Sequence, residues 1–205
     1  MNALSPRRSD GLRSSVPLRV LCGALILLGA SRADATDYFV SASGADAHAG
    51  TSPADAWRTI TRVNNQTLGP GDRVFFEGGQ TFSGNLYLDA SEHGTAAAPI
   101  VIGSYGADRA TIYADAGTGI LVYDTSGVVI RDLYVVGSGS TTNTGNGVFF
   151  FNDLPGGVKL PFVRIDHVDA VQFGEAGILV GGNGDNSGFD DVRITNAIAS
   201  DNRKQ

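Results

Sequence analysis

The pattern of apolar and polar residues between Gly119 and Asn202 repeats three times. Each repeat begins with a glycine and a short run in which apolar side chains alternate, and a second alternating run follows. Side chains alternate between the two faces of a β-strand, so each run places one apolar row on a single face. The Gly-led runs are residues 119–123, 147–151 and 177–181, and the second runs are residues 128–133, 163–168 and 192–197.

Equivalent residues of the second runs form columns when the repeats are aligned. One repeat cannot bury its own apolar row, but repeats stacked about 4.8 Å apart can bury their rows against one another. The pattern therefore predicts an all-β chain that coils into a solenoid. The apolar columns are Val128, Val163 and Val192, then Ile130, Ile165 and Ile194, and a polar column of Asp132, His167 and Asn196 follows.

The repeat length of 28 to 30 residues indicates which solenoid this is. It is too long for hexapeptide or nonapeptide β-helices, and the Leu-x-x-Leu-x-Leu pattern of leucine-rich repeats is absent. Short polar side chains at a bend, such as those of the polar column, can hydrogen-bond neighbouring backbone groups. Over roughly residues 37–202 the sequence resembles the right-handed parallel β-helix family, the pectate-lyase-like solenoids. This resemblance implies a right-handed parallel β-helix, and it says little about the reaction.

Residues 1–35 have the features of a secretory signal peptide. Four arginines precede an apolar run over residues 20–30, and Ala33-Asp34-Ala35 offers small residues at a cleavage point. The apolar run is too short to span a bilayer, which needs about 20 residues. We therefore expect a secreted or periplasmic protein with no membrane attachment after cleavage.

The mature chain is acidic and lacks cysteine. Residues 1–35 hold the single Cys22, five of the 15 Lys and Arg, and two of the 21 Asp and Glu, so the remainder carries a formal charge of −9. This charge argues against binding to nucleic acid or anionic membranes. An acidic polysaccharide would need a cation between itself and such a surface.

We expect one β-helix domain over residues 36–205, with an entry segment at 36–72 and coils from residue 73. Ser52 and Pro53 can start a helix over residues 53–65, whose apolar face of Trp57, Ile60 and Val63 would cover the first coil. After Asn202 the repeat pattern stops, which would leave apolar surface and strand edges exposed. We therefore expect the chain to be incomplete at its C-terminus, and a partner chain covering this end is the alternative.

Aromatic residues occupy outward positions of the Gly-led runs. Alternation directs Tyr123, Phe149 and Phe151 away from the interior, and exposed apolar patches often mark a binding site. Sugars carry C–H faces that can stack on such rings, and in the resembled family the substrate cleft runs along this sheet. We therefore predict that Tyr123, Phe149, Phe151 and the adjacent Asn152 bind polysaccharide. Burial of the rings beneath the long neighbouring loops is the alternative.

A polysaccharide lyase needs a base and a cation beside the uronate carboxylate. Lys159 or Arg164 is the candidate base, and Asp153 and Glu175 are candidate ligands of Ca²⁺, which prefers carboxylate and carbonyl oxygens. Ordinary surface charge is the alternative for all four residues. We predict a secreted, polysaccharide lyase-like protein that acts on or binds acidic polysaccharide. A non-catalytic adhesin-like solenoid and an inactive fragment lacking the catalytic coils are the other hypotheses.

Overall fold

The computed structural model describes residues 1–2, 35–183 and 186–204. The predicted signal peptide lies almost entirely outside the described residues. Every helix and strand among the described residues belongs to the second of two units, which spans residues 33–205. None of the described helices has the length and apolar character needed to cross a bilayer.

The regular secondary structure of the described chain is almost entirely β-strand, and every pairing between its strands is parallel. The short helical elements are η1 (Pro53–Asp55) and α1 (Ile60–Asn64). The strands are β1 (Asp37–Val40), β2 (Arg73–Glu77), β3 (Thr81–Ser83), β4 (Leu86–Leu88), β5 (Ile100–Tyr105), β6 (Ala110–Asp115), β7 (Ile120–Tyr123), β8 (Val128–Gly137), β9 (Val148–Asn152), β10 (Lys159–Val171), β11 (Ile178–Gly182), β12 (Gly188–Thr195) and β13 (Ile198–Ser200).

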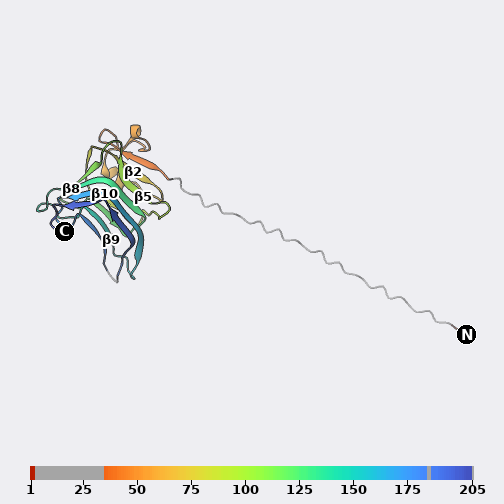
Figure 1. Cartoon of the computed structure of the whole chain (residues 1–205). Helices are drawn as coiled ribbons and strands as arrows, with labels where there is room; N and C mark the ends of the chain where they lie inside the picture. The colour runs from red at the N-terminus through yellow and green to blue at the C-terminus, as the bar shows by residue number, and fades with distance from the viewer. Residues whose placement is uncertain (3–34, 184–185, 205) are drawn as a thin grey trace. The chain divides into compact units, whose positions relative to one another are not determined.

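These strands form two sheets. A nine-stranded sheet, here called the large sheet, has β1, β2, β5, β8, β10 and β12 as successive neighbours, and β3, β6 and β13 complete it. The small sheet contains β4, β7, β9 and β11 in that order. Figure 1 shows β2, β5, β8 and β10 of the large sheet close together, with β9 of the small sheet nearby. The chain visits both sheets in each repeat, so equivalent strands stack in chain order.

The register between the strands confirms the columns that the repeat predicts. In the small sheet Ile120, Val148 and Ile178 are aligned, and in the large sheet Ile130, Ile165 and Ile194 are aligned. Inward residues of both sheets belong to one buried cluster, which includes Ile120, Ile130 and Ile165. The alternation within each run therefore directs one row of each sheet into a shared core.

The third repeat departs from this pattern. Val192 and Ile194 were predicted to be buried, but they are exposed, and Ile194 has 46% of its surface accessible, whereas Ile130 and Ile165 have none. The reason is positional, because β12 and β13 pair only with β10 among the described strands. The register keeps these side chains in the predicted columns, but no described strand pairs with β12 on its other side to complete their burial.

The predicted bend at the polar column is present. Asp132, His167 and Asn196 each adopt the left-handed conformation, with φ of 54°, 54° and 49°. Asn and Asp tolerate this conformation better than most residues because their short side chains can hydrogen-bond locally. The bend turns β8 and β10 partway along their length.

The predicted helix over residues 53–65 is wrong in its extent. η1 and α1 are separate, and Trp57 between them is extended and bridges to Val40. Backbone bonds from Trp57 N to Phe39 O and from Ser41 N to Trp57 O pair this segment with β1. These bonds give partners to backbone groups at the edge of β1, which a continuous helix over residues 53–65 would leave unpaired. Ser52 makes no capping bond, and the Thr59 hydroxyl caps α1 by accepting from Arg62 N.

The entry segment nevertheless covers the first strands. Trp57 is fully buried, stacks on Tyr38 at 4.6 Å between ring centroids, and donates its indole N–H to His48 O. The amide of Asn64 covers the outer edge of β4 by donating to Asn85 O and accepting from Tyr87 N. The entry segment therefore covers the N-terminal end of both sheets.

Candidate functional site

The outward side chains of the small sheet form a largely apolar surface, here called the aromatic face. Phe149 and Phe151 are half-buried, whereas Val148 and Phe150, which alternate with them, are fully buried. The Phe151 ring is near both other predicted rings, with its centroid 6.0 Å from that of Tyr123 and 5.3 Å from that of Phe149. The outward column is therefore confirmed as a geometric feature. The aromatic face consists of Tyr87, Leu121, Tyr123, Phe149, Phe151 and Leu179.

Carboxylates line the edge of the aromatic face where the strands end, and we call this edge the carboxylate rim. Asp89, Asp124 and Asp153 follow β4, β7 and β9, respectively. The Tyr123 hydroxyl donates to Asp153 Oδ1 at 2.7 Å, and the backbone N–H of Asp153 donates to Asp124 Oδ1 at 2.8 Å. The remaining oxygens, Asp124 Oδ2 and Asp153 Oδ2, accept no hydrogen bond from any described residue.

The carboxylate rim perturbs the tyrosines beside it. The hydrogen bond to Asp153, with smaller contributions from desolvation and from the charges of Asp153 and Asp124, raises the pKa of Tyr123 to about 12. Partial desolvation, followed by the charges of Asp89 and Asp124, raises the pKa of Tyr87. Both hydroxyls are therefore protonated at neutral pH, and the edge of the aromatic face carries negative charge.

Asn152 has a different role from its neighbours on β9. Its side chain is fully buried and points away from the aromatic face. Its amide donates to Val158 O and Gly188 O at 2.9 and 2.7 Å, and its oxygen accepts from Leu154 N. Asn152 therefore holds the loop after β9 against the start of β12, and it is not accessible to a surface ligand.

The two predicted bases lie on the large sheet and not on the aromatic face. Lys159 is exposed at the start of β10. Arg164 donates to Asp191 Oδ2 at 2.6 Å, and its guanidinium lies 4.1 Å from the centre of the Phe162 ring. A guanidinium remains protonated in proteins. Arg164 is therefore unsuited to accept a proton, and its partner Asp191 belongs to a structural contact.

The two predicted calcium ligands are not brought together. Glu175 lies before β11, where its backbone N–H donates to Gly145 O, and its carboxylate pairs with Lys204. Gly145 lies before β9, whereas Asp153 follows the end of β9. The two carboxylates are therefore separated along the strand direction by the length of this five-residue strand, roughly 17 Å. Throughout the described ranges, no cluster of three or more His, Cys, Asp or Glu side chains could hold a metal ion.

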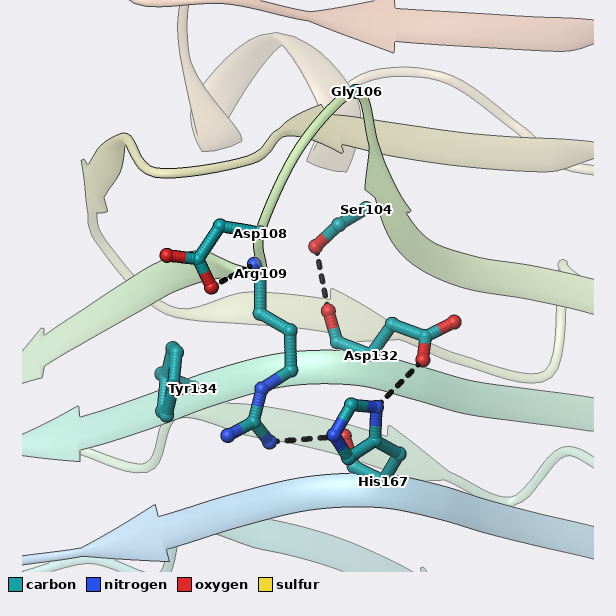
Figure 2. Close-up of a pocket in the computed structure, with 7 residues that line it drawn as sticks. All are labelled: Ser104, Gly106, Asp108, Arg109, Asp132, Tyr134 and His167. Atoms are coloured by element: carbon teal, nitrogen blue, oxygen red, sulfur yellow. Dashed lines mark hydrogen bonds and ion pairs between the residues drawn. The ribbon is translucent and has the colours of Figure 1, made fainter.

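A second candidate site lies on the outside of the large sheet, and we call it the polar depression. Its volume is about 430 Å³. Figure 2 shows that the imidazole of His167 lies between Asp132 and Arg109, and Nδ1 of His167 lies 2.9 Å from Asp132 Oδ1. The lining residues are Ser104, Gly106, Asp108, Arg109, Asp132, Tyr134 and His167.

Arg109 fixes the wall of the polar depression. Its guanidinium makes two hydrogen bonds to the Asp169 carboxylate, at 3.1 and 2.9 Å, and a third to His167 O at 3.2 Å. It also stacks on Tyr134, 3.7 Å from the ring centre. The hydrogen bond to Asp169 raises the pKa of Arg109 above its ordinary value. Arg109 thus connects the β5–β6 loop to β10 across β8.

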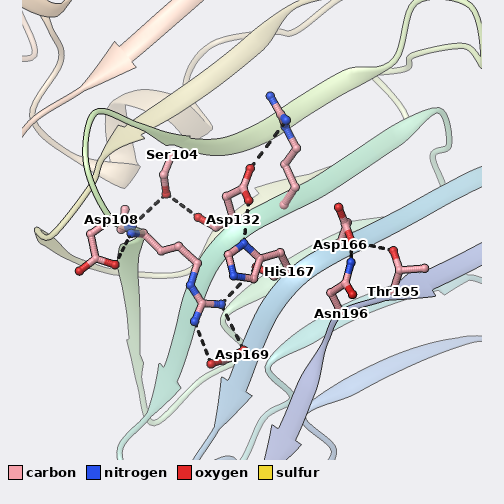
Figure 3. Close-up of polar contacts among 11 residues, drawn as sticks. Ser104, Asp108, Asp132, Asp166, His167, Asp169, Thr195 and Asn196 are labelled. Carbon is pink, nitrogen blue, oxygen red and sulfur yellow. Dashed lines mark hydrogen bonds and ion pairs between the residues drawn. The ribbon is translucent and has the colours of Figure 1, made fainter.

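The polar column continues along the outside of the large sheet, as Figure 3 shows. Asp166 Oδ1 accepts from the Thr195 hydroxyl at 2.7 Å and from the Asn196 amide at 2.8 Å. These bonds lower the pKa of Asp166. The Ser104 hydroxyl extends the chain of contacts by donating to Asp132 O at 2.6 Å. Most polar groups of the depression therefore satisfy one another and hold the bends of adjacent strands together.

The sequence indicated only part of this second site. Asp132, His167 and Asn196 could be found because they align in the repeat. Arg109 could not, because its partner Asp169 is 60 residues away and Arg109 lies before the first repeat. No residue type or spacing near Arg109 signals that contact.

Comparison with known proteins gives one local sequence match and a shared fold. No protein-family model matches the chain. A stretch of 74 residues, 35% of this chain, is 45% identical to the lacto-N-biosidase of Bifidobacterium longum subsp. longum, and it covers 5% of that protein.

Two solved structures are similar over 80% of this chain. The selenomethionine crystal structure of GH136 lacto-N-biosidase from Eubacterium ramulus has a TM-score of 0.65 at 19% identity, and this chain covers 34% of it. The native crystal structure of that enzyme gives 0.64 at 18% identity, with 35% covered. The likeness shows a shared fold. The chain spans about one third of these solved structures and about one twentieth of the curated relative.

Proposed function

We propose that this chain is the glycan-binding part of a right-handed parallel β-helix in a secreted or periplasmic carbohydrate-active protein of the glycoside hydrolase type. Two stacks of parallel strands around one core support the β-helix. The shared fold with a GH136 lacto-N-biosidase supports it further. The local identity of 45% to a second lacto-N-biosidase favours a glycoside hydrolase over a pectate-lyase-like enzyme.

The aromatic face is the observation that carries the proposal. Half-exposed rings beside hydrogen-bonding carboxylates match the usual composition of ligand sites, in which apolar surface supplies contact and a few polar groups fix orientation. The faces of aromatic rings are electron-rich, and the C–H groups of a pyranose are weakly positive, so the two stack favourably. Tyr123, Phe149 and Phe151 retain the sugar-binding role that the sequence suggested.

The charge of the carboxylate rim favours glycans without acidic groups. Asp89, Asp124 and Asp153 would repel a uronate, and no metal-binding cluster lies among the described residues to offset this charge. Arg164 forms an ion pair with Asp191, and the length of β9 separates the carboxylates of Asp153 and Glu175. Neutral glycans therefore fit the site better than the acidic polysaccharide of the lyase hypothesis.

Hydrolysis is a second candidate, and it has a specific structural basis. Glycosidases use two carboxyl groups that flank the glycosidic bond. Asp124 and Asp153 lie at one edge of the aromatic face and are joined through the Asp153 N–H. If the chain itself is catalytic, these are the two carboxyls that we expect to act.

The test uses the chain from residue 36 and a panel of glycans. Neutral oligosaccharides with lacto-N-biose ends, a neutral β-glucan, pectate and alginate are compared by calorimetry, by release of reducing sugar and by absorbance of unsaturated uronides. We expect binding of a neutral glycan. Binding without turnover would favour the adhesin-like hypothesis over hydrolysis. Unsaturated products from pectate or alginate would favour the lyase, and absence of binding to every glycan would refute the proposal.

A further inference from the structure

One glycine on the aromatic face is not explained by backbone packing. Gly119, Gly147 and Gly177 begin the repeats, and a Cβ on any of them would lie within 3 Å of a neighbouring atom. Gly181 differs, because a Cβ there would meet no described atom within 4 Å, and its φ lies outside the left-handed region. Neither close approach nor backbone conformation therefore requires glycine at this position.

The space at Gly181 lies beside the Phe151 ring of the aromatic face. Gly181 is the register partner of Phe151, and Phe151 is the register partner of Tyr123. Adjacent strands are about 4.8 Å apart, so a side chain at position 181 would lie against the Phe151 ring. Its absence leaves open space next to that ring, on the last strand of the small sheet, and we call this space the notch. The next outward residue of β11, Leu179, is 39% exposed and borders the notch along the strand.

Hydrogen-bond acceptors lie beyond the same ring, where β7 and β9 end. Tyr123 contacts Phe151 and is held by Asp153, so its ring has a fixed position. Asp124 Oδ2 and Asp153 Oδ2 accept no bond from the described chain, and carboxylates accept hydrogen bonds from hydroxyl groups readily. A ligand that covers Phe151 and extends to the carboxylate rim would therefore meet a flat apolar surface and two acceptors.

We infer that the notch at Gly181 and the ring of Phe151 form a subsite for one pyranose ring of an uncharged glycan, whose hydroxyl groups donate to Asp124 and Asp153. This inference rests on the proposed function and assigns that function to particular atoms. The sugar stacks on Phe151 in the volume that a side chain at position 181 would fill. A uronate is disfavoured because its carboxylate would lie near two others.

The decisive variant fills the notch without removing any group. Gly181→Leu should fold normally, because position 181 has open space and an unstrained φ. It should weaken binding of the neutral glycan at least tenfold, and Phe151→Ala should do the same. Thr81→Leu adds the same kind of side chain to the large sheet, where Thr81 is exposed, and it should bind like the parent chain.

A second measurement tests the charge. Asp124→Asn and Asp153→Asn should each reduce the discrimination against a uronic-acid oligosaccharide of the same length. Thermal unfolding of each variant shows that its fold is intact.

The possible results separate this inference from the proposed function. If the parent chain binds the neutral glycan and Gly181→Leu binds it equally well, the subsite is refuted while the proposed function stands. If the parent chain binds no glycan, both fail. Tenfold weakening by Gly181→Leu, with an unchanged unfolding temperature and unchanged binding by Thr81→Leu, supports the subsite.

Discussion

The stacked core makes a quantitative prediction for Ile165→Ala. Ile165 lies between Ile130 and Ile194 in the large sheet and is fully buried. The substitution removes Cγ1, Cγ2 and Cδ1, which at about 0.8 kcal/mol per buried carbon amounts to about 2.4 kcal/mol of transfer free energy. A cavity between two strands that cannot close fully brings the total to about 3–4 kcal/mol, within the range for such changes.

Ile194→Ala provides the matched control. It is the same substitution in the same column one strand further on, but 46% of Ile194 is exposed. Because Ile194 is about half exposed in the folded state, the substitution removes only about half as much buried apolar surface. No enclosed cavity forms either, so we expect a cost of about 1 kcal/mol. The contrast between the two variants therefore isolates burial from the chemistry of the side chain.

Urea unfolding of both variants, followed by circular dichroism, measures this contrast. The free energy of unfolding should fall by about 3–4 kcal/mol for Ile165→Ala, with an unchanged dependence on denaturant. In a thermal scan this corresponds to a decrease of roughly 6–16 °C for a domain of this size. Equal losses for the two variants would refute the assignment of Ile165 to an enclosed core.

Three further predictions concern charged and polar groups. Arg109→Lys should cost about 1.5–3 kcal/mol of stability in urea, because lysine cannot reproduce the paired bonds to Asp169, and an unchanged midpoint would contradict the bridging role. Burial raises the pKa of the Glu92 carboxyl above its ordinary value of 4.5, so its ionisation opposes folding increasingly as pH rises above 4.5. Glu92→Gln should therefore gain stability relative to the parent chain at pH 7 and lose that gain below pH 4.5, and a gain independent of pH would exclude titration of Glu92 as the cause. Asp153→Asn should lower the titration of Tyr123 from about 12 towards 10.0, as followed by NMR of labelled tyrosine, and an unchanged value would exclude the hydrogen bond as the main cause.

The repeat allowed the main strands and their register to be predicted from sequence. A glycine followed by alternating apolar residues recurs, and equivalent positions such as Ile130 and Ile165 pair in the structure. The identities of the inward and outward residues followed from the same alternation, so the aromatic face was predictable too. The repeat could not indicate that Ile194 would be exposed, because exposure depends on what lies next to a strand and not on its own sequence.

Contacts outside the repeat were not predictable. The spacing of Trp57, Ile60 and Val63 indicated one helix, but the unpaired edge of β1 draws Trp57 into an extended conformation. Asn152 follows an outward aromatic residue and looked like a ligand, although its position in the alternation already placed it inside. Arg109 and Asp169 meet only because the chain returns to the large sheet after an intervening strand.

The core and the proposed binding surface are separated within a single strand of this protein. Phe150 points inward, is fully buried and meets Phe189 at 5.9 Å between ring centroids, whereas Phe151 points outward and meets Tyr123 and Phe149. Loss of the Phe150 ring removes core contacts, and loss of the Phe151 ring removes surface that the core does not need. Because the side-chain period of a strand is two, a shift of one residue in register would exchange these roles. The glycines that start the repeats hold that register through close backbone contacts, so the same feature that stacks the strands also keeps Phe151 and the notch at Gly181 on the outside.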